Sequence, residues 1–275
     1  MSVFISDAMS LGVYPDPIGA NANSPRIGIE NITNQSNIFE SPTQLDSNPS
    51  WLTSTPSTSE RWKTSPADYH FWYSSPSDAI VDFVGIAAHR GLIGRQIRIL
   101  YTTTTGGGVI YGPAQITDSS PIFINFEEIE PVSIIIVFES TDDFSFEVGN
   151  IYVGKSVFLP RNIYVGHTPI TFGRNVSSLI ENSDNGNYLG NVRTKVSLGS
   201  SVNMSNIDQD YYRDEIFKQF QIPAEVRPFF WAWRPNDRPL ETGFCWTNGD
   251  VRAVNDSTNG DMALSFSMTG FSSNE

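Results

Sequence analysis

The segment Val132–Phe138 constrains the fold of this chain more than any other stretch of its sequence. Apart from Ser133, its residues are all β-branched or aromatic, and such residues favour an extended strand over a helix. A strand that is apolar on both faces is typical of the middle of a layered structure, where both faces are covered. We therefore expect Val132–Phe138 to be a central strand of a β-sandwich.

Other segments carry the patterns of further strands. Ile80–Ile86 predicts a strand with one mostly buried face, and Gln96–Tyr101 alternates apolar with polar residues as a half-exposed strand does. Ser145–Val153 predicts another strand, and Asn191–Leu198 and Met262–Met268 both alternate. Short strands at this spacing are typical of a β-sandwich.

Two features distinguish the C-terminal half. The aromatic segments Pro228–Pro235 and Gly243–Trp246 predict two strands joined by a turn. Between the alternating segments, Asp208–Gln219 predicts the one helix, because Asp208 can cap it, acidic residues fill its first turns and its aromatic residues share a face. We expect Pro223 to end this helix.

The order of these patterns divides the chain into three parts. Residues 1–30 contain prolines and glycines that interrupt any period, so we expect an extended N-terminal arm that frays or docks on a neighbouring subunit. Residues 31–154 predict a β-sandwich, and residues 155–275 a second, smaller β-rich domain with the one short helix. The predicted fold class is all-β, or mainly β.

Charge and composition exclude several classes of function. The chain has 275 residues and a net charge of −13, whereas a nucleic-acid binder needs a basic face, so we expect no nucleic-acid partner. Its single cysteine, Cys245, predicts a buried, inert thiol. The N-terminus lacks the features of a signal peptide and the longest apolar run is too short to span a bilayer, so we expect synthesis in a cytoplasm and no membrane insertion.

The sequence offers little for catalysis. Its three histidines lie far apart and at no metal-ligand spacing: His70, His89 and His167. Phosphate-binding and nucleophile-elbow motifs are absent. We interpret the carboxylates of Glu127–Glu130 and Asp142–Asp143 as solvated turns, with a glycosidase pair, or a calcium site that includes Glu139, as alternatives. The expectation is a protein without enzymatic activity, cofactor or metal.

Aromatic residues are the candidate ligand or interface residues: Trp62, Trp72, Tyr73, Trp231 and Trp233. The first three lie, with Trp51, in loop-like sequence rich in Ser, Thr and Pro. Exposed aromatic rings on loops stack on sugars or fill pockets of a partner. The alternative is that they cap the ends of a sandwich core. For Trp231 and Trp233 we expect a place in the core or in a subunit interface.

Two stretches resemble known proteins. Ala79–Leu92 resembles the strand and turn of galactose-binding-like, or discoidin-like, sandwiches, although Arg90-Gly91-Leu92 replaces the usual residues of the turn. The series Gly149–Gly154, Leu159–Pro169 and Arg227–Pro235 resembles a group of virion proteins from tailed phages, over roughly residues 40 to 270. That resemblance implies a particle component, in the tail or its tip, and transfers no functional residue.

These observations support three hypotheses. The first is a non-enzymatic structural subunit of a phage tail, in the distal tail or tail tip, which forms rings with copies of itself and contacts neighbouring tail proteins. The second is a binding module that recognises a cell-surface glycan through loop aromatics such as Trp62 and Trp72. The third is a polysaccharide-degrading enzyme, which requires two close carboxylates in a cleft.

Overall fold

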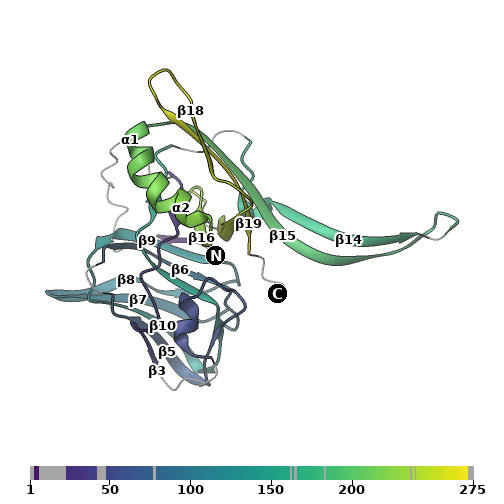
Figure 1. Cartoon of the computed structure of the whole chain (residues 1–275). Helices are drawn as coiled ribbons and strands as arrows, with labels where there is room; N and C mark the ends of the chain where they lie inside the picture. Colours follow the sequence, from purple (N-terminus) through teal and green to yellow (C-terminus); the bar gives the residue numbers. More distant parts are fainter. Residues whose placement is uncertain are drawn as a thin grey trace.

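The computed structural model describes residues 3–5, 23–41, 48–76, 79–161, 163, 166–182, 184–235, 237–238 and 240–271. These residues form two β-rich units, one above the other in Figure 1, and a long two-stranded ribbon that projects from the upper unit. The lower unit is a β-sandwich of two sheets. The upper unit is built on one large sheet with a helix beside it.

The sandwich has a four-stranded and a five-stranded sheet. The order in the first is β1 (Val3–Ile5), β9 (Ile122–Ile129), β6 (Val81–Ala87) and β12 (Asn150–Gly154). The order in the second is β3 (Ile38–Ser41), β5 (Ala67–Ser74), β10 (Ser133–Phe144), β7 (Gln96–Thr103) and β8 (Gly106–Gln115). The 3-10 helix η1 (Ser50–Ser54) and the paired strands β4 (Trp62–Lys63) and β11 (Glu147–Val148) complete the unit.

The sheet of the upper unit has the order β13 (Val157–Phe158), β2 (Arg26–Gly28), β16 (Phe229–Ala232), β17 (Thr242–Thr247), β19 (Met262–Gly270), β15 (Tyr188–Ile207) and β14 (Arg174–Asn182), and β18 (Arg252–Asn255) also pairs with β19. The short helix η2 (Ile170–Phe172) precedes β14. A helix of three consecutive parts follows β15: α1 (Gln209–Tyr211), the π-helical η3 (Tyr212–Gln221) and α2 (Ile222–Ala224).

The predicted fold class is confirmed, since nearly all of the regular structure is strand and the one substantial helix follows β15. The central position predicted for Val132–Phe138 is also confirmed, because β10 pairs with β5 on one side and β7 on the other. The aromatic strands are present as well: β16 and β17 pair antiparallel, with Phe230 opposite Phe244.

The end of the helix differs from the prediction. The cap is as expected, because the Asp208 carboxylate accepts hydrogen bonds from the backbone N–H groups of Asp210 and Tyr211, at 3.0 and 2.9 Å. The helix nevertheless continues through Ala224, beyond Pro223. Proline lacks a backbone donor and its ring crowds the preceding turn of a regular α-helix, but Pro223 lies at the start of α2, directly after the π-helical η3, and the first turn of an α-helical segment tolerates proline.

The described parts of the expected N-terminal arm are strands of the chain's own sheets. β1 pairs in parallel with β9, and β2 lies between β13 and β16 with Ile27 fully buried. Pro15 and Pro17 lie outside the described residues. Because β2 and β13 pair with each other, the chain leaves the upper sheet and returns to it at adjacent positions, and every strand of the sandwich except β1 is inserted between them.

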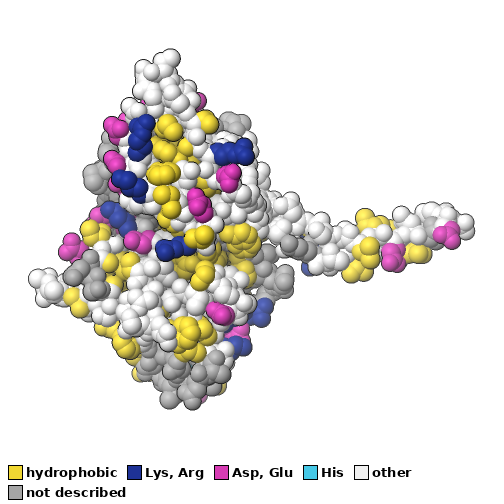
Figure 2. Space-filling model, viewed as in Figure 1, with side chains coloured by type: hydrophobic (Ala, Val, Ile, Leu, Met, Phe, Trp, Pro, Cys, Tyr) yellow, Lys and Arg dark blue, Asp and Glu magenta, His cyan; other side chains and the backbone are white. Residues whose placement is uncertain are grey.

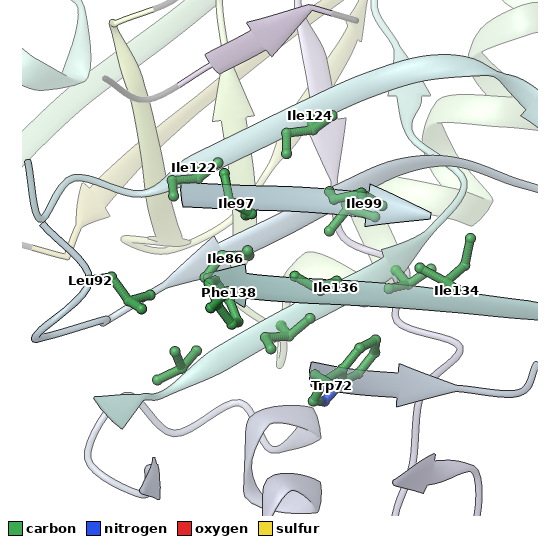
Figure 3. Close-up of a cluster of buried hydrophobic side chains, with 14 of the residues drawn as sticks. Trp72, Ile86, Leu92, Ile97, Ile99, Ile122, Ile124, Ile134, Ile136 and Phe138 are labelled. Atoms are coloured by element: carbon green, nitrogen blue, oxygen red, sulfur yellow. The ribbon is translucent and has the colours of Figure 1, made fainter. Parts of the chain in front are cut away.

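Inward-facing side chains of both sheets form the core of the sandwich. Figure 3 shows Ile97, Ile99, Ile134, Ile136 and Phe138 of the five-stranded sheet close to Ile86, Ile122 and Ile124 of the four-stranded sheet, with Trp72 beside them. All of these side chains are fully buried. Burial of one large apolar side chain contributes about 1.5–3 kcal/mol to the free energy of unfolding, so this core accounts for the stability of the sandwich.

A third buried cluster joins the two units. The outer face of the four-stranded sheet contributes Phe83, Ala87, Phe123 and Tyr152, and the upper unit contributes Phe230, Ala232 and Phe244. Each unit offers the other a glycine. A Cβ atom at Gly85 of β6 would lie 2.5 Å from the Phe230 ring, and one at Gly28 of β2 would lie 2.5 Å from the Phe83 ring. Only glycine permits these two approaches, and the second unit therefore covers the four-stranded sheet.

Candidate interaction surfaces

The ribbon that projects from the upper unit is formed by β14 and the first part of β15, and we call residues 174–182 and 184–198 the β-ribbon. Every residue of β14 is exposed. Figure 1 shows that the β-ribbon extends into solvent away from both units, and Figure 2 shows hydrophobic side chains along it. A two-stranded hairpin without further support is marginally stable in water. The β-ribbon is therefore a surface suited to contact with another molecule.

The β-ribbon carries apolar residues on both faces. Cross-strand pairing places Val176 beside Val196 and Ile180 beside Asn191 on one face, which also holds Tyr188. Val176, Ile180 and Tyr188 are 49%, 57% and 66% exposed. The opposite face holds Leu179 paired with Val192, at 56% and 65% exposed.

The charges of the β-ribbon are not shared equally by its faces. Arg174 and Arg193 lie on the face of Val176, whereas strand register places one basic residue, Lys195, and one acidic residue, Glu181, on the face of Leu179. We call the first of these the basic face. It combines exposed apolar side chains with two guanidinium groups, which suits an apolar and acidic partner surface.

The five-stranded sheet has an apolar row on its outer face. Each of the five strands contributes one residue to this row, and neighbouring residues in it are cross-strand partners. We call these residues the outer row: Phe39, Tyr73, Ile135, Leu100 and Val109. Phe39 is 55% exposed and Val109 45% exposed, and the three central residues are partly exposed. The Phe39 and Tyr73 rings are 5.8 Å apart between centroids. In the next row, Phe71 pairs with Val137, which is also partly exposed.

The other sheet faces of the molecule behave differently. The outer face of the four-stranded sheet is equally apolar, but the upper unit covers it. The upper sheet has an uncovered face that is mostly polar, with Ser201 opposite Ser267 and Asn203 opposite Ser265, beside a hollow of about 490 Å³. Trp246 and Val254 are the exposed apolar residues that strand register places on the same face. A sheet face that meets water is ordinarily polar. Among the described sheet faces, the outer row and the β-ribbon thus both depart from this rule, because both hold apolar side chains in water.

Two of the sequence-predicted aromatics, Trp62 and Trp72, belong to the sandwich core. Trp62 is 1% exposed and packs edge-to-face on Phe146, at 5.0 Å between centroids. Trp72 is fully buried, and its indole N–H donates a hydrogen bond of 3.1 Å to Thr53 Oγ1. Rings without accessible surface cannot stack on a sugar, so the proposed ligand role of Trp62 and Trp72 is wrong. They lie in strands β4 and β5, where loop-like sequence was expected.

The remaining candidates have three different environments. Tyr73 is part of the outer row, on the solvent side of the same strand that buries Trp72. Trp231 is fully buried, with its ring 5.9 Å from that of Phe266. Trp233 is partly exposed, and its indole N–H donates to Glu241 Oε2 at 2.6 Å. Trp231 and Trp233 both lie beside the His167 ring, at 6.2 and 5.1 Å between centroids, but the five residues do not form a single site.

Among the described residues, the histidines and carboxylates form no metal-binding cluster. Each histidine has a ring nitrogen within hydrogen-bond distance of a backbone carbonyl: His70 with Phe144, His89 with Ser120 and His167 with Ser201, at 2.9, 2.9 and 2.8 Å. Glu139 pairs with Arg98, and Glu128 with Lys155 at 2.9 Å. Within the described ranges, no three His, Cys, Asp or Glu side chains are arranged to hold a metal ion. No helix in the described part of the chain is both long and apolar enough to cross a membrane.

One carboxyl group at the junction of the two units has a shifted pKa. Asp82 of β6 is 1% exposed, and burial raises its pKa to about 6, against an opposing effect of the Arg26 guanidinium. The Ser156 backbone N–H and hydroxyl donate to its two oxygens at 2.6 and 2.9 Å. Ser156 lies where the chain returns to the upper sheet, so this interaction fixes the connection between the units. Burial also raises the pKa of the Cys245 thiol, as expected for an inert cysteine.

Comparisons with known proteins find only distant structural likeness. No protein-family model and no curated protein matches the sequence. A GH29 fucosidase of Ruminococcus gnavus in complex with fucose is 15% identical over 46% of this chain and 27% of its own, with a TM-score of 0.39. Chitosan-binding module 1 from a chitosanase/glucanase of Paenibacillus sp. IK-5 is 12% identical over 45% of this chain and 98% of its own, with a TM-score of 0.40.

A pectin-binding carbohydrate-binding module is also similar, with 10% identity over 46% of this chain and 91% of its own, and a TM-score of 0.37. Binding modules thus stand among these neighbours, and none of the three proteins named is a phage protein. The chain spans about a quarter of the fucosidase. Likeness at this level carries no argument about the ligand, partner or activity of the chain.

Sequence reasoning missed both the β-ribbon and the outer row. The signal for the β-ribbon was present, because Asn191–Leu198 alternates, but alternation does not say whether the apolar face meets its own chain or another. The signal for the outer row lay in the unbroken apolar run of β10. That run predicts cover on both faces, and the described chain covers only one.

Proposed function

We propose that this chain is a non-enzymatic structural subunit that builds a homomeric assembly through its β-ribbon. One observation carries the proposal: the β-ribbon holds Val176, Leu179, Ile180, Tyr188 and Val192 in water, each about half exposed or more. Apolar side chains on both faces of an isolated ribbon are stabilised only when another surface covers them. A subunit that reaches its neighbour supplies that surface.

The proposed setting is the tail of a phage particle, where rings of one subunit are assembled in the host cytoplasm. This setting rests on the resemblance of the segments Gly149–Gly154, Leu159–Pro169 and Arg227–Pro235 to tail proteins. The upper unit that carries the β-ribbon contains two of these segments. Neighbouring tail proteins are further proposed partners.

The test is the native mass of the purified protein by light scattering over a range of concentrations. We expect a discrete oligomer. A variant with Leu179→Ser, Ile180→Asn and Val192→Thr removes apolar area from both ribbon faces and should be a monomer at the same concentrations. Val226→Thr is the matched control, because Val226 is 80% exposed outside the β-ribbon. A wild-type monomer at every concentration, or an oligomer that the triple variant preserves, would contradict the proposal.

A second candidate function is recognition of a glycan by the aromatic residues on the outer face of the five-stranded sheet. Phe39, Tyr73 and Tyr69 are the observation in its favour, since Phe39 and Tyr69 are 55% and 47% exposed and Phe39 contacts Tyr73. Exposed aromatic rings stack on sugars. A glycan array with the wild-type protein and Tyr69→Ala tests it, and the absence of any bound glycan would exclude it for the glycans present.

A further inference from the structure

We propose that the outer row of one copy is the docking surface for the basic face of the β-ribbon of a second copy, so that copies join head to tail. This inference rests on the proposed function and names the surface that the β-ribbon contacts. A heterologous contact of this kind closes into a ring when the rotation between copies permits it.

The outer row requires a cover that the described chain does not supply. Its five residues form a continuous apolar line across all five strands, and Phe71 and Val137 widen it. The same molecule covers the apolar outer face of its four-stranded sheet with the upper unit, and the uncovered face of the upper sheet is mostly polar beside Ser201 and Asn203. The outer row is therefore as apolar as the sheet face that the upper unit covers, and we expect another surface to cover it.

The β-ribbon of the same copy cannot provide this cover. Figure 1 shows that it projects from the upper unit away from the sandwich, whereas the five-stranded sheet lies on the far side of the sandwich from the upper unit. A β-ribbon that covers an outer row must therefore come from another copy.

The two surfaces match in length. Five strands at a spacing of about 4.8 Å place Phe39 and Val109 roughly 19 Å apart across the sheet. On the basic face, apolar residues extend from Val176 to Tyr188, which pairs with Asn182. Six residues of strand at about 3.3 Å each give roughly 20 Å for this distance. A β-ribbon that lies across the strands of the sheet thus aligns its apolar line with the outer row.

Charge favours this pairing over the alternatives. Residues 31–154 contain fourteen acidic and five basic residues, a net charge of −9. Residues 174–198 contain two acidic and three basic residues, a net charge of +1, and both arginines lie on the basic face. Opposite charges steer two surfaces together, whereas two sandwiches that meet through their own outer rows repel each other.

A second exposed apolar surface lies on the helix, at Phe217, Ile222 and Val226. Residues 209–227 contain four acidic and three basic residues, a net charge of −1, so this surface attracts the basic face less than the sandwich does. The helix is the appropriate competitor in an experiment.

Cysteine cross-linking tests the contact directly, because the native Cys245 is fully buried and does not interfere. We would introduce one cysteine per variant into the full chain: Ser178→Cys on the basic face, Val109→Cys in the outer row and Val226→Cys beside the helix. A short bis-maleimide is then added to each variant alone and to equal mixtures. We expect a cross-linked dimer in the mixture of Ser178→Cys with Val109→Cys, and not in the other mixtures or with single variants.

Other patterns would overturn the inference in identifiable ways. A cross-linked dimer of the Val109→Cys variant alone means that two five-stranded sheets contact each other. A cross-linked dimer of the Ser178→Cys variant alone means that two β-ribbons contact each other. A dimer that forms only when the Val226→Cys variant is present means that the helix is the docking surface. An oligomer without any of these cross-links refutes the inference and leaves the proposed function intact, whereas a wild-type monomer refutes both.

A substitution in the outer row provides an independent measurement. Tyr73→Ser should raise the Kd of self-association by roughly tenfold or more, because aromatic residues at the centre of an interface contribute most of its affinity. Thr247→Ser, on the upper sheet, is the control that should leave the Kd unchanged. If Tyr73→Ser instead abolishes binding to a glycan array and leaves self-association unchanged, the face is a glycan site and the docking inference is wrong.

Discussion

The contact between Gly85 and Phe230 allows a quantitative test of how the two units are joined. A methyl group at Gly85 would lie 2.5 Å from the Phe230 ring, whereas carbon atoms in contact ordinarily lie about 3.5–4.0 Å apart. The ring must therefore move by roughly 1 Å in a cluster where it is fully buried. Overpacking of this kind costs about 1–3 kcal/mol, which we expect as the loss of unfolding free energy for Gly85→Ala.

The reverse change opens the same contact. Phe230→Ala removes a fully buried ring that lies 4.9 Å from Phe244 and 5.6 Å from Tyr152 between centroids, and such truncations cost about 3–5 kcal/mol. In the double variant the new methyl group occupies space that the ring has left. We therefore expect Gly85→Ala with Phe230→Ala to cost about 1–2 kcal/mol less than the two single changes together.

Urea denaturation followed by circular dichroism measures these differences. Gly190→Ala is the matched control, because a Cβ atom there would meet nothing within 4 Å and the residue lies in a strand of the exposed β-ribbon. We expect this control to change the free energy of unfolding by less than about 1 kcal/mol. The reasoning is wrong if Gly85→Ala lowers the free energy of unfolding no more than Gly190→Ala does. It is also wrong if the loss in the double variant equals the sum of the losses in the two single variants.

Three further predictions concern single residues. The pKa of Asp82 in the folded protein, about 6, lies above its usual value of 3.8, so its contribution to stability is complete below about pH 4 and is lost as pH rises through 6. We expect the free energy of unfolding of the wild type to fall by about 3 kcal/mol between pH 4 and pH 7, and Asp82→Asn to abolish this fall. The measurement is urea denaturation at several pH values from 4 to 7, and the prediction is wrong if the free energy of unfolding changes with pH by the same amount in the wild type and in the variant. Thr53→Val leaves the Trp72 indole N–H unpaired in the core and should cost about 1–3 kcal/mol by thermal unfolding, and a neutral result would mean that the bond contributes nothing. Trp233→Phe loses a hydrogen bond at a partly exposed site and should cost less than about 1.5 kcal/mol in the same assay, so a larger loss would point to an undetected packing role.

The sequence was sufficient to predict the strands whose apolar or aromatic pattern is unbroken. β10 is apolar and β-branched, and its central position follows from that pattern. The aromatic pair β16 and β17 was predictable for the same reason. Strand β5 was not recognised, because its buried face combines Trp72 with His70 and Ser74, and polar residues inside the core conceal the alternation.

The candidate site was predicted less well, for a different physical reason. Aromatic residues were singled out by type, but whether a ring is buried depends on strand register. Trp72 and Tyr73 are adjacent in sequence and lie on opposite faces of the same strand, so one is core and the other is surface. The alternation of apolar and polar residues in the β-ribbon likewise predicts that one face meets an apolar surface, but it does not show whether that surface belongs to the same chain or to another molecule.

The insertion of the sandwich between β2 and β13 has a mechanical consequence. Besides the segment that links β1 to β2, two connections join the sandwich to the upper sheet, and the strands that carry them pair with each other at Val157 and Ile27. A force applied to the sandwich is divided between two neighbouring strands, and the hydrogen bond from Ile32 N to Val153 O at 2.9 Å ties the connections together just before they separate. A single linker would let the sandwich swivel. The paired connections resist torsion, so a load on one unit turns the other with it.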